Sequence, residues 1–124
     1  MLTKAEVYPT LPAVDLQRAR KFYEETLGLK VIRIDPSPGI LFGAGNGTAI
    51  YLYQRGATKA DHTEAAFKID DVEAEVKELK AKGVKFEEVD IPGMKTVDGI
   101  ATMDGYKGAW FKDTEGNILG IANM

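Results

Sequence analysis

The sequence has no cysteine, only one histidine and no long apolar run. The absence of cysteine excludes disulfides, thiolate metal sites and a cysteine nucleophile. No segment approaches the roughly 20 apolar residues of a membrane span, and no apolar signal-peptide core stands near the N-terminus. A net charge of −3 with mixed signs leaves no basic stripe for nucleic acid. We therefore expect a cytoplasmic protein with no membrane or nucleic-acid partner.

The chain instead contains an internal repeat. The segments 14–31 and 69–86 each run from an apolar residue and an aspartate, through a helical period, to a glycine and a β-prone tail. Asp15 and Gly28 have the same spacing as Asp70 and Gly83. An aspartate can cap the start of a helix, and a glycine can end one in the left-handed conformation. The repeat predicts two copies of one structural unit.

A chain of 124 residues with 44% hydrophobic content is large enough for one compact core. We therefore predict a single domain over 1–124, with module one at about 5–54, a linker at about 55–61 and module two at about 62–123.

Each module is predicted as β-α-β-β-β. In module one a helix begins at Asp15, with strands at 6–13, 29–34, 40–42 and 48–53; Asn46-Gly47 indicates a hairpin between the last two. In module two the helix covers 71–82 and the strands are 62–69, 84–91, 109–112 and 118–122. The long glycine-rich stretch 92–108 is predicted to be a mobile loop with a short strand near 100–103.

The strands have one aliphatic and one polar face, since successive side chains of a strand point to opposite sides. Ile50 and Leu52, for example, oppose Tyr51 and Tyr53. We expect the helices to pack on the aliphatic face. The other face collects residues with polar tips: Tyr8, Thr10, Tyr51, Tyr53, His62 and Glu64. Such a face either meets solvent or a dimer mate, or lines a ligand cleft.

Four motifs carry a resemblance to a known family. They are Val-Asp-Leu-x5-Phe-Tyr-x3-Leu-Gly-Leu, Ala-Phe-x-Ile-Asp-Asp-Val, Leu-x3-Gly-Val-x-Phe and Trp-Phe-x-Asp-x-x-Gly-Asn. In this order the chain resembles the vicinal oxygen chelate superfamily, which includes glyoxalase I, bleomycin-resistance proteins and extradiol dioxygenases. The resemblance implies an α+β fold of two tandem βαβββ modules. Their curved mixed sheets form a cleft, their helices lie on the outer face, and a homodimer usually completes the structure.

The resemblance also marks four positions where metal-dependent members carry ligands. In this chain they are Tyr8, Tyr51, Glu64 and Gly120. A site of this kind needs three or four nitrogen or oxygen donors, and only Glu64 is an ordinary ligand. His62 could contribute to a partial site, although a lone histidine at a strand entrance is more often structural or exposed. We therefore expect no divalent metal and no other cofactor.

The leading hypothesis is a metal-independent homodimer that binds a small, partly aromatic molecule, as bleomycin-resistance proteins do. Gly120 would leave space for the ligand, and Trp110 fits either the core or the wall of a pocket. The predicted ligand-binding residues are Tyr8, Thr10, Tyr51, Tyr53, His62, Glu64, Trp110 and Gly120. The alternatives are a glyoxalase-like lyase or isomerase, or a dioxygenase-related enzyme, with Glu64 as general base or metal ligand, and a dimeric accessory domain without a pocket.

Overall fold

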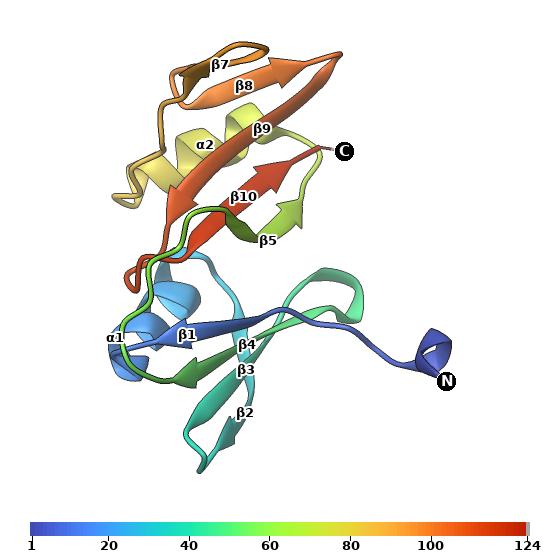
Figure 1. Cartoon of the computed structure of the whole chain (residues 1–124), viewed down its shortest axis with the longest axis vertical. Helices are drawn as coiled ribbons and strands as arrows, with labels where there is room; N and C mark the ends of the chain where they lie inside the picture. The colour runs from blue at the N-terminus through green and yellow to red at the C-terminus, as the bar shows by residue number, and fades with distance from the viewer. Residues whose placement is uncertain (124) are drawn as a thin grey trace. The chain divides into compact units, whose positions relative to one another are not determined.

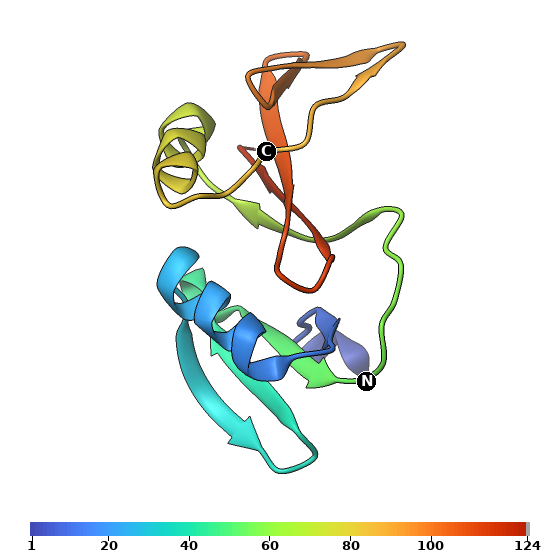
Figure 2. The same cartoon turned by 90° about the vertical axis from the view of Figure 1, so that its left-hand side faces the viewer.

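The structure is a computed structural model that describes residues 1–123. The chain forms two compact units: unit one covers Met1–Thr58, and unit two begins at Lys59. Each unit contains a curved mixed sheet with a helix on one face (Figures 1 and 2). The predicted α+β fold of two modules is confirmed.

Unit one contains a four-stranded sheet in the order β1-β4-β3-β2. Strand β1 runs parallel to β4, and the other pairs are antiparallel. The predicted hairpin at Asn46-Gly47 is confirmed, because β3 and β4 pair directly across it. Its elements are the 3₁₀ turn Leu2–Lys4, β1 (Thr10–Ala13), α1 (Leu16–Lys21), the π-helical turn Phe22–Thr26, β2 (Lys30–Asp35), β3 (Gly39–Gly43), the 3₁₀ turn Gly45–Gly47 and β4 (Ala49–Gln54).

Unit two repeats this order and extends it. Its sheet runs β5-β10-β9-β8-β7-β6, with β5 parallel to β10 as β1 is to β4. Among residues 1–123, no helix is both long enough and apolar enough to cross a bilayer. The elements are β5 (Thr63–Lys68), α2 (Val72–Ala81), β6 (Asp90–Ile91), β7 (Met94–Val97), β8 (Ile100–Met103), β9 (Tyr106–Lys112) and β10 (Ile118–Ala122).

The prediction of a loop over 92–108 is wrong, although its short strand at 100–103 is confirmed as β8. Most of the stretch is paired in the β6–β9 meander. The reason is turn chemistry: Asp98-Gly99 and Asp104-Gly105 join the strands with positive φ at both residues, as two-residue hairpin turns require. The predicted strand 84–91 is also mostly wrong, because only the bridge Phe86↔Phe111 and the short β6 pair there.

The core of each unit lies between its helix and the aliphatic face of its sheet. In unit one Tyr23 stacks on Phe42, with ring centroids 5.4 Å apart. In unit two α2 buries Val72, Val76 and Leu79. The predicted packing face is therefore confirmed. The buried sheet residues are Leu11, Ala13, Ile40, Phe42, Ile50 and Leu52 in unit one, and Ala101, Ala109, Phe111, Leu119 and Ile121 in unit two.

The two helices begin at equivalent aspartate caps. The carboxylate of Asp15 accepts a hydrogen bond from the Arg18 amide at 3.0 Å, and that of Asp71 accepts one from the Ala74 amide at 3.0 Å. The counterpart of Asp15 is thus Asp71 and not Asp70. The first helix is one residue longer from cap to glycine. Its π-helical turn, closed by the Leu27 amide on the Phe22 carbonyl at 3.0 Å, accommodates that residue.

The motif Asp-x-x-Gly-Asn forms the turn between β9 and β10. Asp113 Oδ1 accepts hydrogen bonds from the amides of Glu115 and Asn117, at 2.8 and 2.9 Å. The Asn117 side chain donates to Asp113 Oδ2 at 2.8 Å, and both residues are buried. This part of the family motif therefore holds a hairpin together.

The capping role of Asp71 can be tested against its neighbour Asp70. Asp71→Ala should lower the free energy of unfolding by about 1 kcal/mol, because the first turn of α2 loses its side-chain acceptor. The control Asp70→Ala, which removes the same charge one residue earlier, should cost less than about 0.5 kcal/mol. Urea denaturation followed by circular dichroism measures both. Equal losses would contradict the assignment of Asp71 as the cap.

Candidate functional site

Within unit one, the face of the sheet opposite α1 presents two rows of side chains across all four strands. We call it the open face. The first row follows the register Thr10↔Tyr51↔Leu41↔Arg33, and the second follows Pro12↔Tyr53↔Gly39↔Asp35. Thr10 and Pro12 thus lie on the β1 side of the two β4 tyrosines. On the other side, beyond β3, lies the charged pair Arg33 and Asp35.

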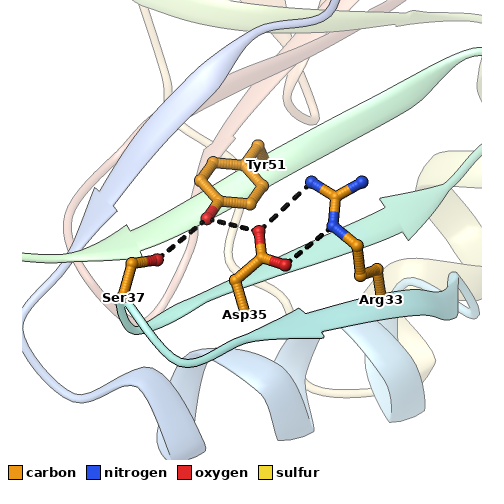
Figure 3. A network of polar contacts seen from close by, with 4 residues as sticks. All are labelled: Arg33, Asp35, Ser37 and Tyr51. Carbon is orange, nitrogen blue, oxygen red and sulfur yellow. Dashed lines mark hydrogen bonds and ion pairs between the residues drawn. The ribbon is translucent and has the colours of Figure 1, made fainter.

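A hydrogen-bonded network joins the two rows (Figure 3). Arg33 donates to Asp35 through two nitrogens, Nε to Oδ1 at 2.7 Å and Nη2 to Oδ2 at 3.2 Å. The Tyr51 hydroxyl donates to Asp35 Oδ2 at 3.0 Å. The Ser37 hydroxyl lies 3.4 Å from the same tyrosine oxygen. Asp35 therefore holds both an arginine fork and a tyrosine in fixed positions.

Gly39 makes this network sterically possible. Tyr51 belongs to the first row and reaches diagonally over Gly39 to Asp35 in the second. A Cβ atom at position 39 would overlap the Tyr51 hydroxyl and lie 2.5 Å from its Cζ atom. The missing side chain of Gly39 therefore provides the space that the tyrosine ring occupies.

The electrostatics of the network follow from these contacts. The hydrogen bond from Arg33, followed by that from Tyr51, lowers the pKa of the Asp35 carboxyl. The pKa of Arg33 is raised by its hydrogen bond to Asp35 and by that carboxylate's charge, with smaller contributions from Tyr8 and Tyr51. Tyr8 precedes β1, at the opposite edge of the sheet from β2. The curved sheet thus brings Tyr8 within electrostatic reach of Arg33.

The predicted residues of unit two include a tryptophan–glycine pair. Trp110 pairs with Gly120, and Ala66 pairs with Gly120 from the other side. Because Ala109 and Phe111 are buried, Trp110 lies on the face opposite the core. A Cβ atom at Gly120 would lie 3.3 Å from Trp110 Cδ1 and 3.4 Å from Nε1. This edge of the indole therefore packs over Gly120, which is buried, together with the Thr63 methyl group, which lies 3.4 Å from the same Cβ position.

Glu64 occupies an irregular position on β5. The register shifts between Ile118, which pairs with Thr63, and Leu119, which pairs with Ala65. Glu64 is therefore left outside the regular pairing. Glu64 as a whole is half-buried. Within residues 1–123, its Oε1 atom is buried and has no hydrogen-bond partner. An unpartnered buried acceptor costs free energy and calls for an explanation.

His62 is paired with its neighbour. Its Nδ1 atom lies 2.8 Å from Asp61 Oδ1, and the side chain is 75% exposed. The pKa of His62 is raised chiefly by the hydrogen bond to Asp61, and the charge of Glu64 contributes least. The ring is thus engaged by Asp61 rather than by Glu64.

The predicted site residues fall into two groups. Unit one contains Tyr8, Thr10, Tyr51 and Tyr53, and unit two contains His62, Glu64, Trp110 and Gly120. Sequence reasoning missed Arg33, Asp35 and Ser37. The signal for the first two was available, because charged residues at alternate positions of the predicted strand 29–34 and its end share one face.

The family model described as "Glyoxalase/Bleomycin resistance protein/Dioxygenase superfamily" matches residues 7–121. A search of curated proteins found no match.

Solved structures show the same fold at low identity. UcmS2 is 18% identical with a TM-score of 0.75, covering 96% of this chain and 97% of its own. The antibiotic binding protein TnmS3 from Streptomyces sp. CB03234 is 21% identical with a TM-score of 0.66, covering 98% and 96%. The fosfomycin resistance protein FosX from Listeria monocytogenes is 17% identical with a TM-score of 0.69, covering 95% and 89%. At these identities the likeness concerns the fold alone.

The network makes the titration of Asp35 a test of the site. Its folded-state pKa should lie below the unfolded value of about 3.9, and Arg33→Met should raise it more than Tyr51→Phe. Because the folded pKa is lowered, the stabilisation by Asp35 is complete above the unfolded pKa and disappears as pH falls through the folded one. Carboxyl ¹³C NMR titration measures these values.

Gly39→Ala should raise the Asp35 pKa by about as much as Tyr51→Phe, because the new methyl group displaces the ring. Gly56→Ala is the matched control, since a Cβ atom there has no neighbour within 4 Å. An unchanged Asp35 pKa in Gly39→Ala would show that Tyr51 reaches the carboxylate by another route.

Proposed function

The chain belongs to the Glyoxalase/Bleomycin resistance protein/Dioxygenase superfamily, and from this premise we propose that it binds a small, partly aromatic molecule without a metal ion. The open face of unit one is the binding surface in this proposal. Tyr51 and Tyr53 supply flat rings for stacking, and small-molecule sites typically combine such rings with a few placed polar groups.

The observation that carries the proposal is the network around Asp35. Its hydrogen bonds fix the orientation of Arg33 and Tyr51 before any ligand arrives. Groups ordered in advance lose less conformational entropy on binding. Within residues 1–123, the hydroxyls of Tyr8 and Tyr53 have no hydrogen-bond partner and remain open to a ligand.

The metal-independent part of the proposal rests on donor chemistry. The resemblance places metal ligands at Tyr8, Tyr51, Glu64 and Gly120. The hydroxyl proton of Tyr51 is donated to Asp35, and Gly120 has no side chain. One carboxylate and two phenol hydroxyls do not match the three or four nitrogen or carboxylate donors of a typical divalent site. These residues do not fit the divalent metal of the family's metal-dependent members. The proposed binding involves no step through a metal.

A homodimer belongs to the same proposal. Strand β2 is an edge of the unit-one sheet, and its Ile32 and Ile34 are 60% and 58% exposed. An uncovered edge strand with apolar side chains is a surface that a second copy can bury.

Binding is tested with a thermal-shift screen of bleomycin, quinoline and 2-naphthamide, with fosfomycin as the non-aromatic comparator. At least one aromatic compound should raise the melting temperature, and fosfomycin should not. Tyr53→Ala should weaken the binding by about fivefold, because a stacking ring is worth about 1 kcal/mol.

The matched control is Tyr106→Ala, which removes an exposed tyrosine from β9 of unit two. Its affinity should stay within about twofold of the parent. If no aromatic compound stabilises the protein, or if the two variants bind equally, the proposed binding surface is wrong.

A second candidate function is an isomerase or lyase with Glu64 as general base. The observation that favours it is the buried, unpartnered Oε1 atom. A carboxylate kept without a partner at a cost in stability is what a proton-transfer site requires, since the substrate then supplies the missing donor.

For this candidate, Glu64→Gln should abolish turnover of the hemithioacetal of methylglyoxal and glutathione, measured by absorbance. Glu87→Gln is the control, because Glu87 is a partly exposed partner of Lys112. Equal turnover in the parent and Glu64→Gln would remove Glu64 as the base.

A further inference from the structure

We propose that Arg33 anchors a negatively charged oxygen of the ligand, so that the open face of unit one selects acidic aromatic molecules such as aryl carboxylates and phenolates. This inference rests on the proposed function and specifies the ligand class of the same surface. Its basis is the set of hydrogen bonds that Arg33 and Tyr51 donate to Asp35, and the donors of Arg33 that remain free within residues 1–123.

Arg33 has donors to spare. Its Nε and Nη2 atoms are bonded to Asp35. Within residues 1–123, its Nη1 nitrogen has no hydrogen-bond partner, and the side chain is 52% exposed. Figure 3 shows this nitrogen on the side of the guanidinium turned away from the Asp35 carboxylate. A guanidinium edge with free N–H groups matches the two oxygens of a carboxylate.

Asp35 has little acceptor capacity left for a cationic ligand. Both of its oxygens already accept hydrogen bonds, Oδ1 from Arg33 and Oδ2 from Arg33 and Tyr51. Its side chain is also only 25% exposed. The charged pair is neutral as a whole, but its accessible part is the arginine. The polarity of this surface therefore favours acceptors over donors in the ligand.

The two rows contain no second cation among the described residues, and Lys30, opposite Gly43, lies in the next row of the same face. Thr10, Tyr51 and Leu41 share the row of Arg33, and Pro12, Tyr53 and Gly39 share that of Asp35. The Tyr51 hydroxyl is held toward Asp35, so its ring has a fixed orientation. A planar ligand lying on the tyrosine rings would thus have Arg33, which shares Asp35 with Tyr51, as an adjacent cation. Hydrogen bonds to a charged acceptor are about twice as strong as neutral ones, which makes this contact selective.

The test uses three probes with one ring system: 2-naphthoate, 2-naphthamide and 2-naphthylmethylamine. NMR titration at pH 7 should give 2-naphthoate a dissociation constant about tenfold lower than that of 2-naphthamide, and the amine should bind most weakly. Arg33→Met should remove the preference for the carboxylate and leave 2-naphthamide within about twofold. Arg33→Lys, which keeps the charge but loses the fork, should retain part of the preference.

Arg20→Met is the matched control. Arg20 lies on α1, is 34% exposed, and forms an ion pair with Glu24 at 2.6 Å, much as Arg33 does with Asp35 at 2.7 Å. Arg20→Met removes one positive charge, as Arg33→Met does, but from the opposite side of the sheet. The preference for 2-naphthoate should persist in this variant, and circular dichroism should show that all three variants are folded.

The outcomes of this test separate the two hypotheses. Equal affinities for the carboxylate and the amide in the parent protein would overturn the role of Arg33 while leaving aromatic binding intact. A preference that survives Arg33→Met, or that is lost equally in Arg20→Met, would also overturn it. If no probe binds, the proposed function itself fails, and this inference fails with it.

Discussion

The parallel pairing of β1 with β4 is the constraint on which the open face of unit one depends. It sets Thr10 opposite Tyr51 and Pro12 opposite Tyr53. The antiparallel hairpins then carry the same two rows across β3 to β2. Because one face of the sheet must be buried under α1, a shift of one residue would exchange the core and the open face. Burial of Leu11, Ile50 and Leu52 therefore keeps the tyrosines on the open face.

Much of the fold could be predicted from local patterns. Helical periods bounded by aspartate and glycine identified both helices, and alternation identified the buried face of β4 and β10. The glycine-rich stretch 92–108 was misread because glycine serves both flexible loops and tight turns. What separates the two is the preceding aspartate: Asp98 and Asp104 adopt positive φ together with the glycines that follow them. A dipeptide of this kind between short β-prone runs indicates a hairpin.

The candidate site was less accessible to sequence reasoning. Alternation placed Tyr51 and Tyr53 on one face without any structure, because β4 is regular. It could not show that Tyr51 crosses Gly39 to reach Asp35, since that contact lies on a diagonal between strands. Glu64 is a harder case, because the register shift beside it interrupts the alternation on which its placement depended. Pairing between distant strands is a tertiary property that one sequence does not display.

The π-helical turn of unit one accounts for a difference in length between the two modules. Unit one has one more residue than unit two between the capping aspartate and the glycine, and the π-helical turn accommodates it. The spacing before the cap is therefore the same in both units. Tyr8 and Glu64 accordingly each lie seven residues before the capping aspartates, Asp15 and Asp71. The same backbone position of the repeated unit therefore carries a phenol in one module and a carboxylate in the other. Two units with the same strand and helix order thus present different chemistry at equivalent places.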